Sequence, residues 1–365
     1  MIKLIILLPA ILFSILFNNH ANCQSLQPGF LKEEYRQLMY ISARTGALDS
    51  TYYSDIPEPS GFKMTYRSPK MGLDNLWDLW TNDQSGIAIS IRGTTDKAES
   101  WASNFYAAMV PAKGELKLSE TEVFKYELAT DAKAAVHVGW LLSMAYLSKD
   151  IMPKIDSSCK MGVRDILIIG HSQGGAISFL LTSYLYHLQK QNKLPADLRI
   201  KTYCSAGPKP GNLYYAYDYE SITKNGWAFN VVNSADWVPE TPISIQTLND
   251  FNSTNPFVHL QPMIKKQKFL QRIALRHVFK KLDKPTRKAQ KNYEKYLGER
   301  ISKQVNKVLP DFVPPAYYSS NHYVRTGATI VLTPDSSYDA IYPDNPKTLF
   351  IHHLHKPYLH LLNKY

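Results

Sequence analysis

Apolar positions recur with two different periods along the chain, and each period predicts a type of element. Residues 29–48 carry apolar side chains three and four positions apart, which predicts an amphipathic helix. Residues 73–92 alternate apolar and polar positions around an Asn-Asp-Gln-Ser-Gly turn at 82–86, which predicts a hairpin. A helical pattern follows at 132–147. The first half of the chain therefore predicts both helices and strands.

Strand and helix patterns alternate in the next segment. Residues 164–169 include four consecutive aliphatic side chains, as in a central parallel strand that is covered on both faces, and 176–188 has the length of a crossover helix. Further strands are expected at 198–205, 227–232 and 328–332, with a short helix from about Pro357 to the C-terminus. This alternation predicts an α/β fold with a mostly parallel central sheet.

Residues 245–325 interrupt this pattern as a helical, Lys/Arg-rich insertion. Apolar positions at helical spacing occur in both halves of 265–308, and Pro285 is expected to break the run into two amphipathic helices. Residues 265–307 hold 15 Lys and Arg against three acidic residues, a net charge of +12, whereas the whole chain carries +11. The positive charge is therefore local, and the remainder of the chain carries −1.

Three interpretations of the basic segment at 265–307 remain open. The first is a solvated helical face without a partner, the second is a peripheral contact with an anionic membrane surface, and the third is a nucleic-acid site. Export of the protein would disfavour nucleic acid as a partner.

The N-terminus has the layout of a secretory signal peptide. Lys3 is followed by about 14 apolar residues, fewer than the roughly 20 that cross a bilayer, and then by a short polar stretch that ends at Cys23. We expect cleavage after Cys23, so that residues 1–23 are removed and 24–365 form the mature protein. A lipid anchor on Cys23 is the alternative. Either outcome predicts an extracytoplasmic protein, whether secreted or periplasmic.

Residues 170–174 read Gly-His-Ser-Gln-Gly and fit the G-x-S-x-G nucleophile elbow. The motif follows the most apolar predicted strand and opens the predicted helix at 176–188, which is the context that such an elbow requires. Ser172 is therefore the candidate nucleophile. A serine hydroxyl is a weak nucleophile, so it needs a base within hydrogen-bond reach and an acid that orients the base.

The acid and the base of an α/β-hydrolase follow the serine in that order. Asp236 lies in a loop just after the predicted strand at 227–232 and is the candidate acid, with Glu240 as its substitute. Seven histidines follow Asp236, and three of them crowd into a loop before the C-terminal helix: His352, His353 and His355. Spacing alone does not decide among these three.

Several blocks resemble the class 3 lipase family of fungal, plant and related bacterial enzymes. Residues 91–94 (Ile-Arg-Gly-Thr) resemble its oxyanion turn, 136–140 (Val-His-Val-Gly-Trp) its helix start, and 170–175 its G-H-S-x-G-G elbow. Residues 233–239 resemble its N-x-x-D-x-V-P block, and 353–360 match its H-x-x-x-x-Y-L-H pattern. The resemblance covers roughly 74–240 and, more weakly, the last 40 residues, and it favours His353 as the base over His355 and His352.

The resemblance implies acyl transfer through a Ser172-Asp236-His353 triad, without a metal or an organic cofactor. The oxyanion hole would use Gln173, the residue after the nucleophile, and Thr94, whose side chain caps the hole in the family. Residues 96–110 occupy the place of the family's apolar lid, although an ordinary packed helix is the alternative. Trp101, Phe105 and His171 of the elbow are the expected substrate-site side chains. The other expected site residues are those of the triad and the oxyanion hole.

The sequence thus predicts a secreted serine carboxyl-ester hydrolase, most simply a lipase that acts on acylglycerols. A phospholipase or a non-lipid esterase would use the same residues. A non-catalytic lipid- or surface-binding protein on a hydrolase fold is the alternative from another class. The oligomeric state is left open by the sequence.

Overall fold

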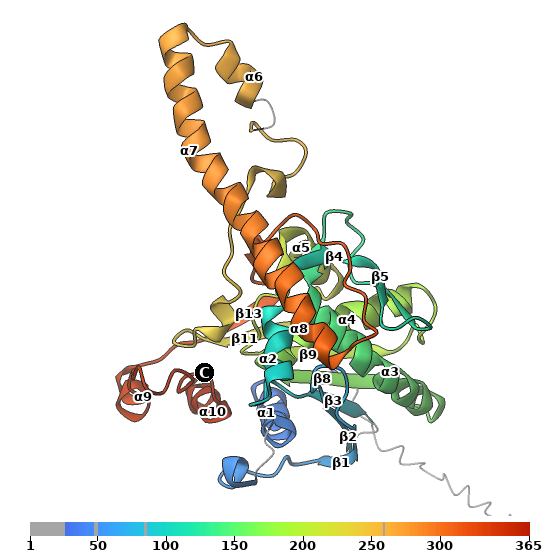
Figure 1. Ribbon diagram of the computed structural model, residues 1–365. Helices are drawn as coiled ribbons and strands as arrows, with labels where there is room; N and C mark the ends of the chain where they lie inside the picture. Colours follow the sequence, from blue (N-terminus) through green and yellow to red (C-terminus); the bar gives the residue numbers. More distant parts are fainter. Residues whose placement is uncertain (1–25, 47–49, 84–85, 258–259) are drawn as a thin grey trace, which may run out of the picture.

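A seven-stranded sheet forms the centre of the computed structural model, which describes residues 26–46, 50–83, 86–257 and 260–365 (Figure 1). The expected signal peptide lies outside these residues. The strands run in the order β1-β2-β3-β8-β9-β11-β13, with β1 to β3 antiparallel and the pairs from β3 to β13 parallel. Their bounds are β1 Phe62–Arg67, β2 Trp77–Asn82, β3 Ile87–Ile91, β8 Asp165–His171, β9 Arg199–Ser205, β11 Ala228–Asn233 and β13 Ala328–Leu332. The predicted α/β fold with a mostly parallel sheet is confirmed.

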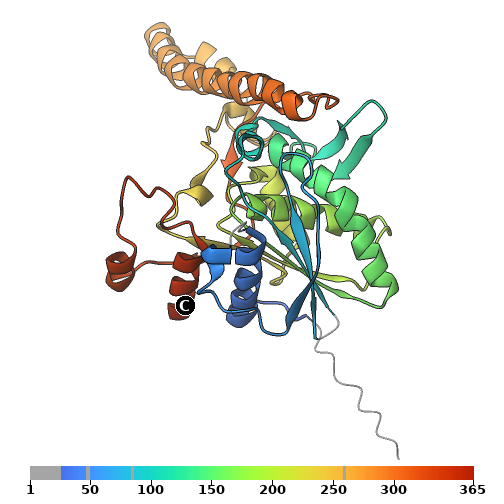
Figure 2. The same ribbon diagram turned by 60° about the horizontal axis from the view of Figure 1, so that its bottom comes forward.

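Helices cover both faces of this sheet (Figure 2). One face packs against α3 (Val138–Lys160) and α4 (Gln173–Lys190), and the other against α1 (Lys32–Gly46) and α10 (His355–Lys364). Successive residues of β8 alternate between the two cores, with Ile166 and Ile168 on the α3/α4 side and Leu167 and Ile169 on the α1/α10 side. This alternation explains why the central strand is apolar at every position.

Smaller elements flank the main sheet. A second sheet has the order β12-β10-β7-β4, and a two-stranded ribbon joins β5 to β6. The strands are β4 Met109–Pro111, β5 Lys113–Lys117, β6 Val123–Glu127, β7 Ala135–His137, β10 Gly211–Asn212 and β12 Tyr323–Val324. The remaining helices of the body are α2 Ala98–Phe105, α5 Leu213–Ile222 and α9 Ser336–Ile341, with short 3-10 turns at Ser50–Tyr53, Val238–Glu240 and Leu248–Asp250.

The helix expected at 132–147 is placed wrongly by the sequence pattern. Its first residues instead form β7, which pairs with β4 on one side and β10 on the other. The helix α3 begins at Val138, where the His137 side chain caps it by accepting a hydrogen bond from the Trp140 N–H at 3.3 Å. It then continues to Lys160, because its buried side chains pack in the apolar core that α3 shares with α4.

Residues 260–294 form an arm that projects from the body (Figure 1). It consists of α6 (Leu260–Lys265) and α7 (Phe269–Glu294); α7 continues through a π-helical turn (Lys295–Arg300) into α8 (Ile301–Val308). The expectation that Pro285 breaks the helix is wrong, because Pro285 lies inside α7. Lys281, whose carbonyl group loses its N–H partner to Pro285, is exposed, so water can bind that carbonyl.

The segment 245–325 connects two neighbouring parallel strands, β11 and β13. After α8 it returns along the body, where the Val313 N–H bonds to the Lys117 carbonyl and the Tyr318 N–H to the Met109 carbonyl. Among the described residues, none of the helices, α7 included, is both long and apolar enough to span a membrane.

Candidate active site

Ser172 lies on a sharp turn between β8 and α4, with φ 63° and ψ −130°, in a region that residues other than glycine rarely adopt. Neighbouring chain segments approach this turn very closely at two positions. A Cβ at residue 170 would lie 2.1 Å from the Gly174 carbonyl oxygen, and one at residue 174 would lie 2.2 Å from the Ile91 carbonyl oxygen. Glycine at these two positions therefore allows the strained conformation that exposes the Ser172 side chain to the pocket.

A buried carboxylate lies beside this serine. Asp236, 3% exposed, follows β11 and accepts a hydrogen bond from His353 Nδ1 at 2.7 Å. The same oxygen accepts one from the Tyr358 hydroxyl at 2.8 Å, and the other oxygen accepts one from the Val238 N–H at 3.0 Å. Three donors thus fix the carboxylate, which in turn orients the His353 ring.

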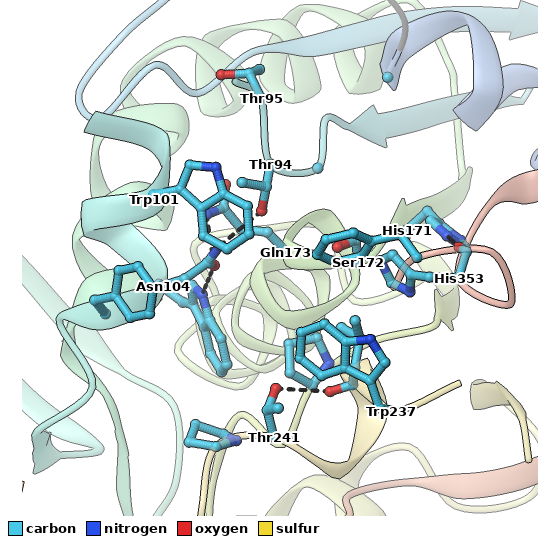
Figure 3. Close-up of a pocket in the computed structure, with 18 of the residues that line it drawn as sticks. Thr94, Thr95, Trp101, Asn104, His171, Ser172, Gln173, Trp237, Thr241 and His353 are labelled. Carbon is cyan, nitrogen blue, oxygen red and sulfur yellow. Dashed lines mark hydrogen bonds between the residues drawn. The ribbon is translucent and has the colours of Figure 1, made fainter. Parts of the chain in front are cut away.

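Ser172 and His353 line the same pocket, and the His353 ring lies beside the serine in Figure 3. Within the described residues there is no direct hydrogen bond between the two side chains. Hydrogen bonds of this kind are often long in a ligand-free site and tighten when substrate binds.

The structure separates the three clustered histidines. The ring of His352 lies between the Tyr338 hydroxyl at 2.8 Å and Asp344 at 3.0 Å. His355 lies against the Tyr52 hydroxyl at 3.0 Å and the Ser42 hydroxyl at 3.1 Å.

Burial lowers the pKa of His355 to about 3, with a further contribution from His353. His355 is therefore neutral, and both of its ring nitrogens already have partners. Of the three, His353 is the one that bonds to Asp236. Glu240, the alternative acid, is exposed.

His171 supports the His353 segment from the elbow. Its Nε2 donates to the His353 carbonyl at 2.5 Å, so its Nδ1 accepts from the Ser205 hydroxyl at 3.0 Å. The ring is 4.9 Å from that of His353 and 4.3 Å from that of His355. Burial and these two neighbours lower the pKa of His171 well below its usual range. The expected substrate-site residue thus touches the pocket, while its polar atoms hold the backbone of the histidine loop.

Thr94 and Gln173 are linked through Asn104 of α2 (Figure 3). The Asn104 side-chain amide donates to the Thr94 hydroxyl at 2.8 Å. Its carbonyl oxygen accepts from Gln173 Nε2 at 2.8 Å and from Trp140 Nε1 at 3.0 Å. The structure therefore brings the two expected oxyanion-hole residues together beside Ser172.

The cavity in front of Ser172 has a volume of about 660 Å³ and mainly apolar walls. On α2, Trp101 stacks on Phe105 with ring centroids 5.8 Å apart, and both side chains line the cavity. The α2 backbone packs closely on α3, because a Cβ at Gly139 would lie 2.0 Å from the Ser103 carbonyl oxygen. Further apolar walls come from Ala107, Trp140, Trp237, Val238, Ile243, Leu297, Phe350 and Leu354.

Sequence reasoning missed several of these residues. Asn104 gave no signal, because its role depends on contacts with segments 10, 36 and 69 residues away. Tyr358 was part of the histidine-to-tyrosine pattern, and its spacing from His353 was the available signal. The wall residue Leu297 comes from the basic segment, for which the sequence offered no counterpart.

A serine on a strained strand-to-helix turn, next to a buried carboxylate–imidazole pair, defines a serine carboxyl-ester hydrolase with the α/β-hydrolase fold. The family model described as lipase (class 3) matches residues 88–245. Over these residues the chain is similar to the class 3 lipases. The matched segment carries the oxyanion turn, the elbow and Asp236.

Several solved structures are similar to this chain. A lipase from Yarrowia lipolytica is 20% identical over 60% of this chain and 79% of that chain, with a TM-score of 0.43. A lipase from Rhizopus microsporus var. chinensis is 21% identical over 58% and 69%, with a TM-score of 0.40. A triacylglycerol lipase from Penicillium expansum is 14% identical over 57% and 72%, with a TM-score of 0.43. No curated protein sequence matches the chain.

Proposed function

We propose that the protein is a lipase that hydrolyses acylglycerols, with Ser172 as nucleophile, His353 as base and Asp236 as the acid that orients it. The observation that carries the proposal is the 2.7 Å hydrogen bond between Asp236 and His353 Nδ1, beside a serine on an elbow. Nδ1 is then the protonated nitrogen, which leaves Nε2 free to accept a proton.

The reaction proceeds by acyl transfer. The Ser172 oxygen attacks the ester carbonyl carbon while its proton passes to His353 Nε2, and the Asp236 carboxylate stabilises the resulting imidazolium. When the tetrahedral intermediate collapses, the C–O bond to the alcohol breaks and the leaving alcohol takes the proton from His353. Water then attacks the acyl-enzyme by the same route, which releases the acid and regenerates the serine.

The developing oxyanion is stabilised by the Gln173 N–H and by Thr94. Because the Asn104 amide donates to the Thr94 oxygen, the hydroxyl hydrogen of Thr94 is not used in that bond and can point at the oxyanion. The Gln173 side chain bonds to Asn104 and to the Ser100 carbonyl, which fixes the residue whose N–H the oxyanion meets. Hydrogen bonds thus hold the side chains of both residues in place before substrate binds.

The apolar cavity supports an acyl chain as the occupant. Each methylene that leaves water contributes about 0.8 kcal/mol, so kcat/KM should rise roughly fourfold per methylene until the cavity is filled. Rates on p-nitrophenyl esters of increasing chain length test this expectation. A flat series, or a maximum at acetate, would favour a non-lipid esterase, and faster release of fatty acid from phospholipid than from triacylglycerol would favour a phospholipase.

A fluorophosphonate probe distinguishes the enzyme from a non-catalytic binding protein. We expect stoichiometric labelling of the wild type, none of Ser172→Ala, and strong labelling of the matched control Ser234→Ala, which alters an exposed serine near Asp236. Equal labelling of wild type and Ser172→Ala would refute the nucleophile assignment. An unlabelled wild type that binds lipid would favour the binding protein.

We also propose that the protein is exported and that residues 1–23 are removed as a signal peptide. Sequencing of the exported protein should then begin at Gln24. A chain that keeps Cys23 with a covalent lipid would instead show the anchored form.

A further inference from the structure

The arm formed by α6 and α7 carries an excess of positive charge. From Lys265 to Lys291 it holds 11 Lys and Arg against a single acidic residue, Asp283. Asp283 pairs with Arg287, and no other basic side chain of this stretch forms an ion pair among the described residues. The charge is also concentrated on a structure that projects into solvent (Figure 1).

The basic side chains of α7 form a stripe along one face of the helix. Its members follow one another at steps of three or four residues, which places them in one row on a helix: Arg276, Lys280, Lys284, Arg287 and Lys291. With 26 residues α7 is about 39 Å long, so the stripe extends over roughly half of its length.

An apolar cluster continues this stripe at the far end of the arm. Phe269 and Ile273 precede Arg276 in the same row, and Leu270 lies next to them. Their side chains are 65%, 53% and 78% exposed, respectively. The first turn of α7 is the part of the arm farthest from the sheet (Figure 1). The arm therefore presents an exposed apolar tip followed by a basic stripe.

The root of the arm is part of the active-site wall. Tyr293 and Leu297 line the cavity in front of Ser172. The Leu297 carbonyl accepts the Ala108 N–H at 3.2 Å, and a Cβ at Gly298 would lie 2.9 Å from the Ala108 Cβ. The helix that forms the arm therefore packs directly against the wall of the pocket at its inner end.

We propose that this arm binds an anionic lipid surface, with Phe269, Leu270 and Ile273 in the interface and the basic stripe on the headgroups. Exposed apolar side chains next to Lys and Arg are what an interfacial helix requires, since the first leave water and the second attract anionic lipid. Nucleic acid would be attracted by the stripe alone and offers no place for the apolar tip. The proposal rests on the proposed function and names the surface at which the enzyme works. Because vesicle binding is measured without turnover, the membrane proposal can fail while the lipase proposal holds, and the reverse.

Sedimentation of the full-length mature protein with vesicles tests the proposal. We compare vesicles of phosphatidylcholine alone with vesicles that contain 30% phosphatidylserine, at low and at high salt. The wild type should bind the anionic vesicles more tightly, and high salt should reduce this difference because it screens the charges. The triple variant Lys280→Gln/Lys284→Gln/Lys291→Gln should lose about fivefold per charge, roughly 100-fold in all, on anionic vesicles.

Matched variants separate the stripe from charge in general. Lys63→Gln/Lys125→Gln/Lys193→Gln removes three exposed lysines from the body and should bind anionic vesicles within about threefold of the wild type. The tip variant Phe269→Ser/Leu270→Ser should weaken binding to both kinds of vesicle by about tenfold or more. All three variants should keep wild-type rates on a soluble p-nitrophenyl ester, since none of these residues lines the cavity.

Several outcomes would overturn the proposal. A wild type without preference for anionic vesicles excludes it, as does a stripe variant that binds like the wild type. Binding to duplex DNA that needs the stripe, together with no vesicle binding, would make nucleic acid the partner. A protein that dimerises through the tip and does not bind vesicles would make a second copy of the chain the partner.

Discussion

The substitution Thr94→Val isolates one hydroxyl group of the oxyanion hole. Valine keeps the shape of threonine and the backbone N–H, so the change removes only the hydroxyl that accepts from the Asn104 amide at 2.8 Å. If the hydroxyl hydrogen donates to the oxyanion, its loss costs about 3 kcal/mol in the transition state, on the order of 100-fold in kcat. KM should change little, because the oxyanion does not exist in the ground state.

The same substitution has a separate effect on stability. It leaves the Asn104 amide without its acceptor, which costs about 1–3 kcal/mol where the group is removed from water. Thermal unfolding measures this loss independently of turnover. A fold that remains intact at the assay temperature therefore allows the change in kcat to be assigned to catalysis.

Steady-state kinetics on p-nitrophenyl butyrate provides the measurement. Thr94→Ser is the matched control, because it restores the hydroxyl and should retain kcat within about fivefold of the wild type. Retention of wild-type kcat by Thr94→Val would refute the role of the hydroxyl and leave the backbone N–H groups as the donors. An equal loss in Thr94→Ser and Thr94→Val would show that the methyl packing matters instead.

Three further predictions concern His353, Tyr358 and His355. Replacing His353 by Ala should lower kcat at least about 10³-fold, whereas His355→Gln should retain most activity, and the reverse ranking in the same ester assay would exchange their roles. Tyr358→Phe removes one hydrogen-bond donor from Asp236. We expect kcat to fall about fivefold to tenfold and the acid limb of the pH–kcat profile to move to higher pH. If the acid limb does not move, Tyr358 serves only to pack against its neighbours. Burial lowers the pKa of His355 to about 3, so the unfolded chain gains a proton below pH 6.5 that the folded chain does not yet take. The stability due to this group is complete above pH 6.5 and is lost toward pH 3 by up to about 1.4 kcal/mol per pH unit. Urea unfolding should therefore show that the difference in the free energy of unfolding between wild type and His355→Gln becomes smaller as the pH falls over this range.

Local patterns in the sequence predicted the elements whose stability depends on local contacts. The four aliphatic residues at 166–169 predicted the central strand, since a strand covered on both faces needs apolar side chains at every position. The elbow at 170–174 was predictable for a similar reason, because its glycines meet neighbours within the same motif and in the adjacent strand. The class of chemistry followed from these two features.

Features that depend on distant contacts were not predictable. The choice among His352, His353 and His355 depends on which ring meets a carboxylate more than 110 residues earlier in the chain. The start of α3 at Val138 depends on strand partners that take up the preceding residues. Pro285 was expected to end a helix, but an exposed helix can tolerate the lost hydrogen bond where water replaces it. Nothing in the sequence indicated that Leu297 would reach the cavity.

The single continuous helix that links the tip of the arm to the pocket subjects its residues to two different requirements. Near Phe269 the helix is surrounded by solvent, so any side chains of suitable polarity and charge would serve there. Near Gly298 a side chain would have no room, because an added Cβ would lie within 3 Å of Tyr317 and Ala108, so shape matters more than polarity. A designer could therefore exchange the outer turns to redirect the enzyme to another surface without touching turnover. A change of a single methyl group at the inner end would reshape the space that the substrate occupies.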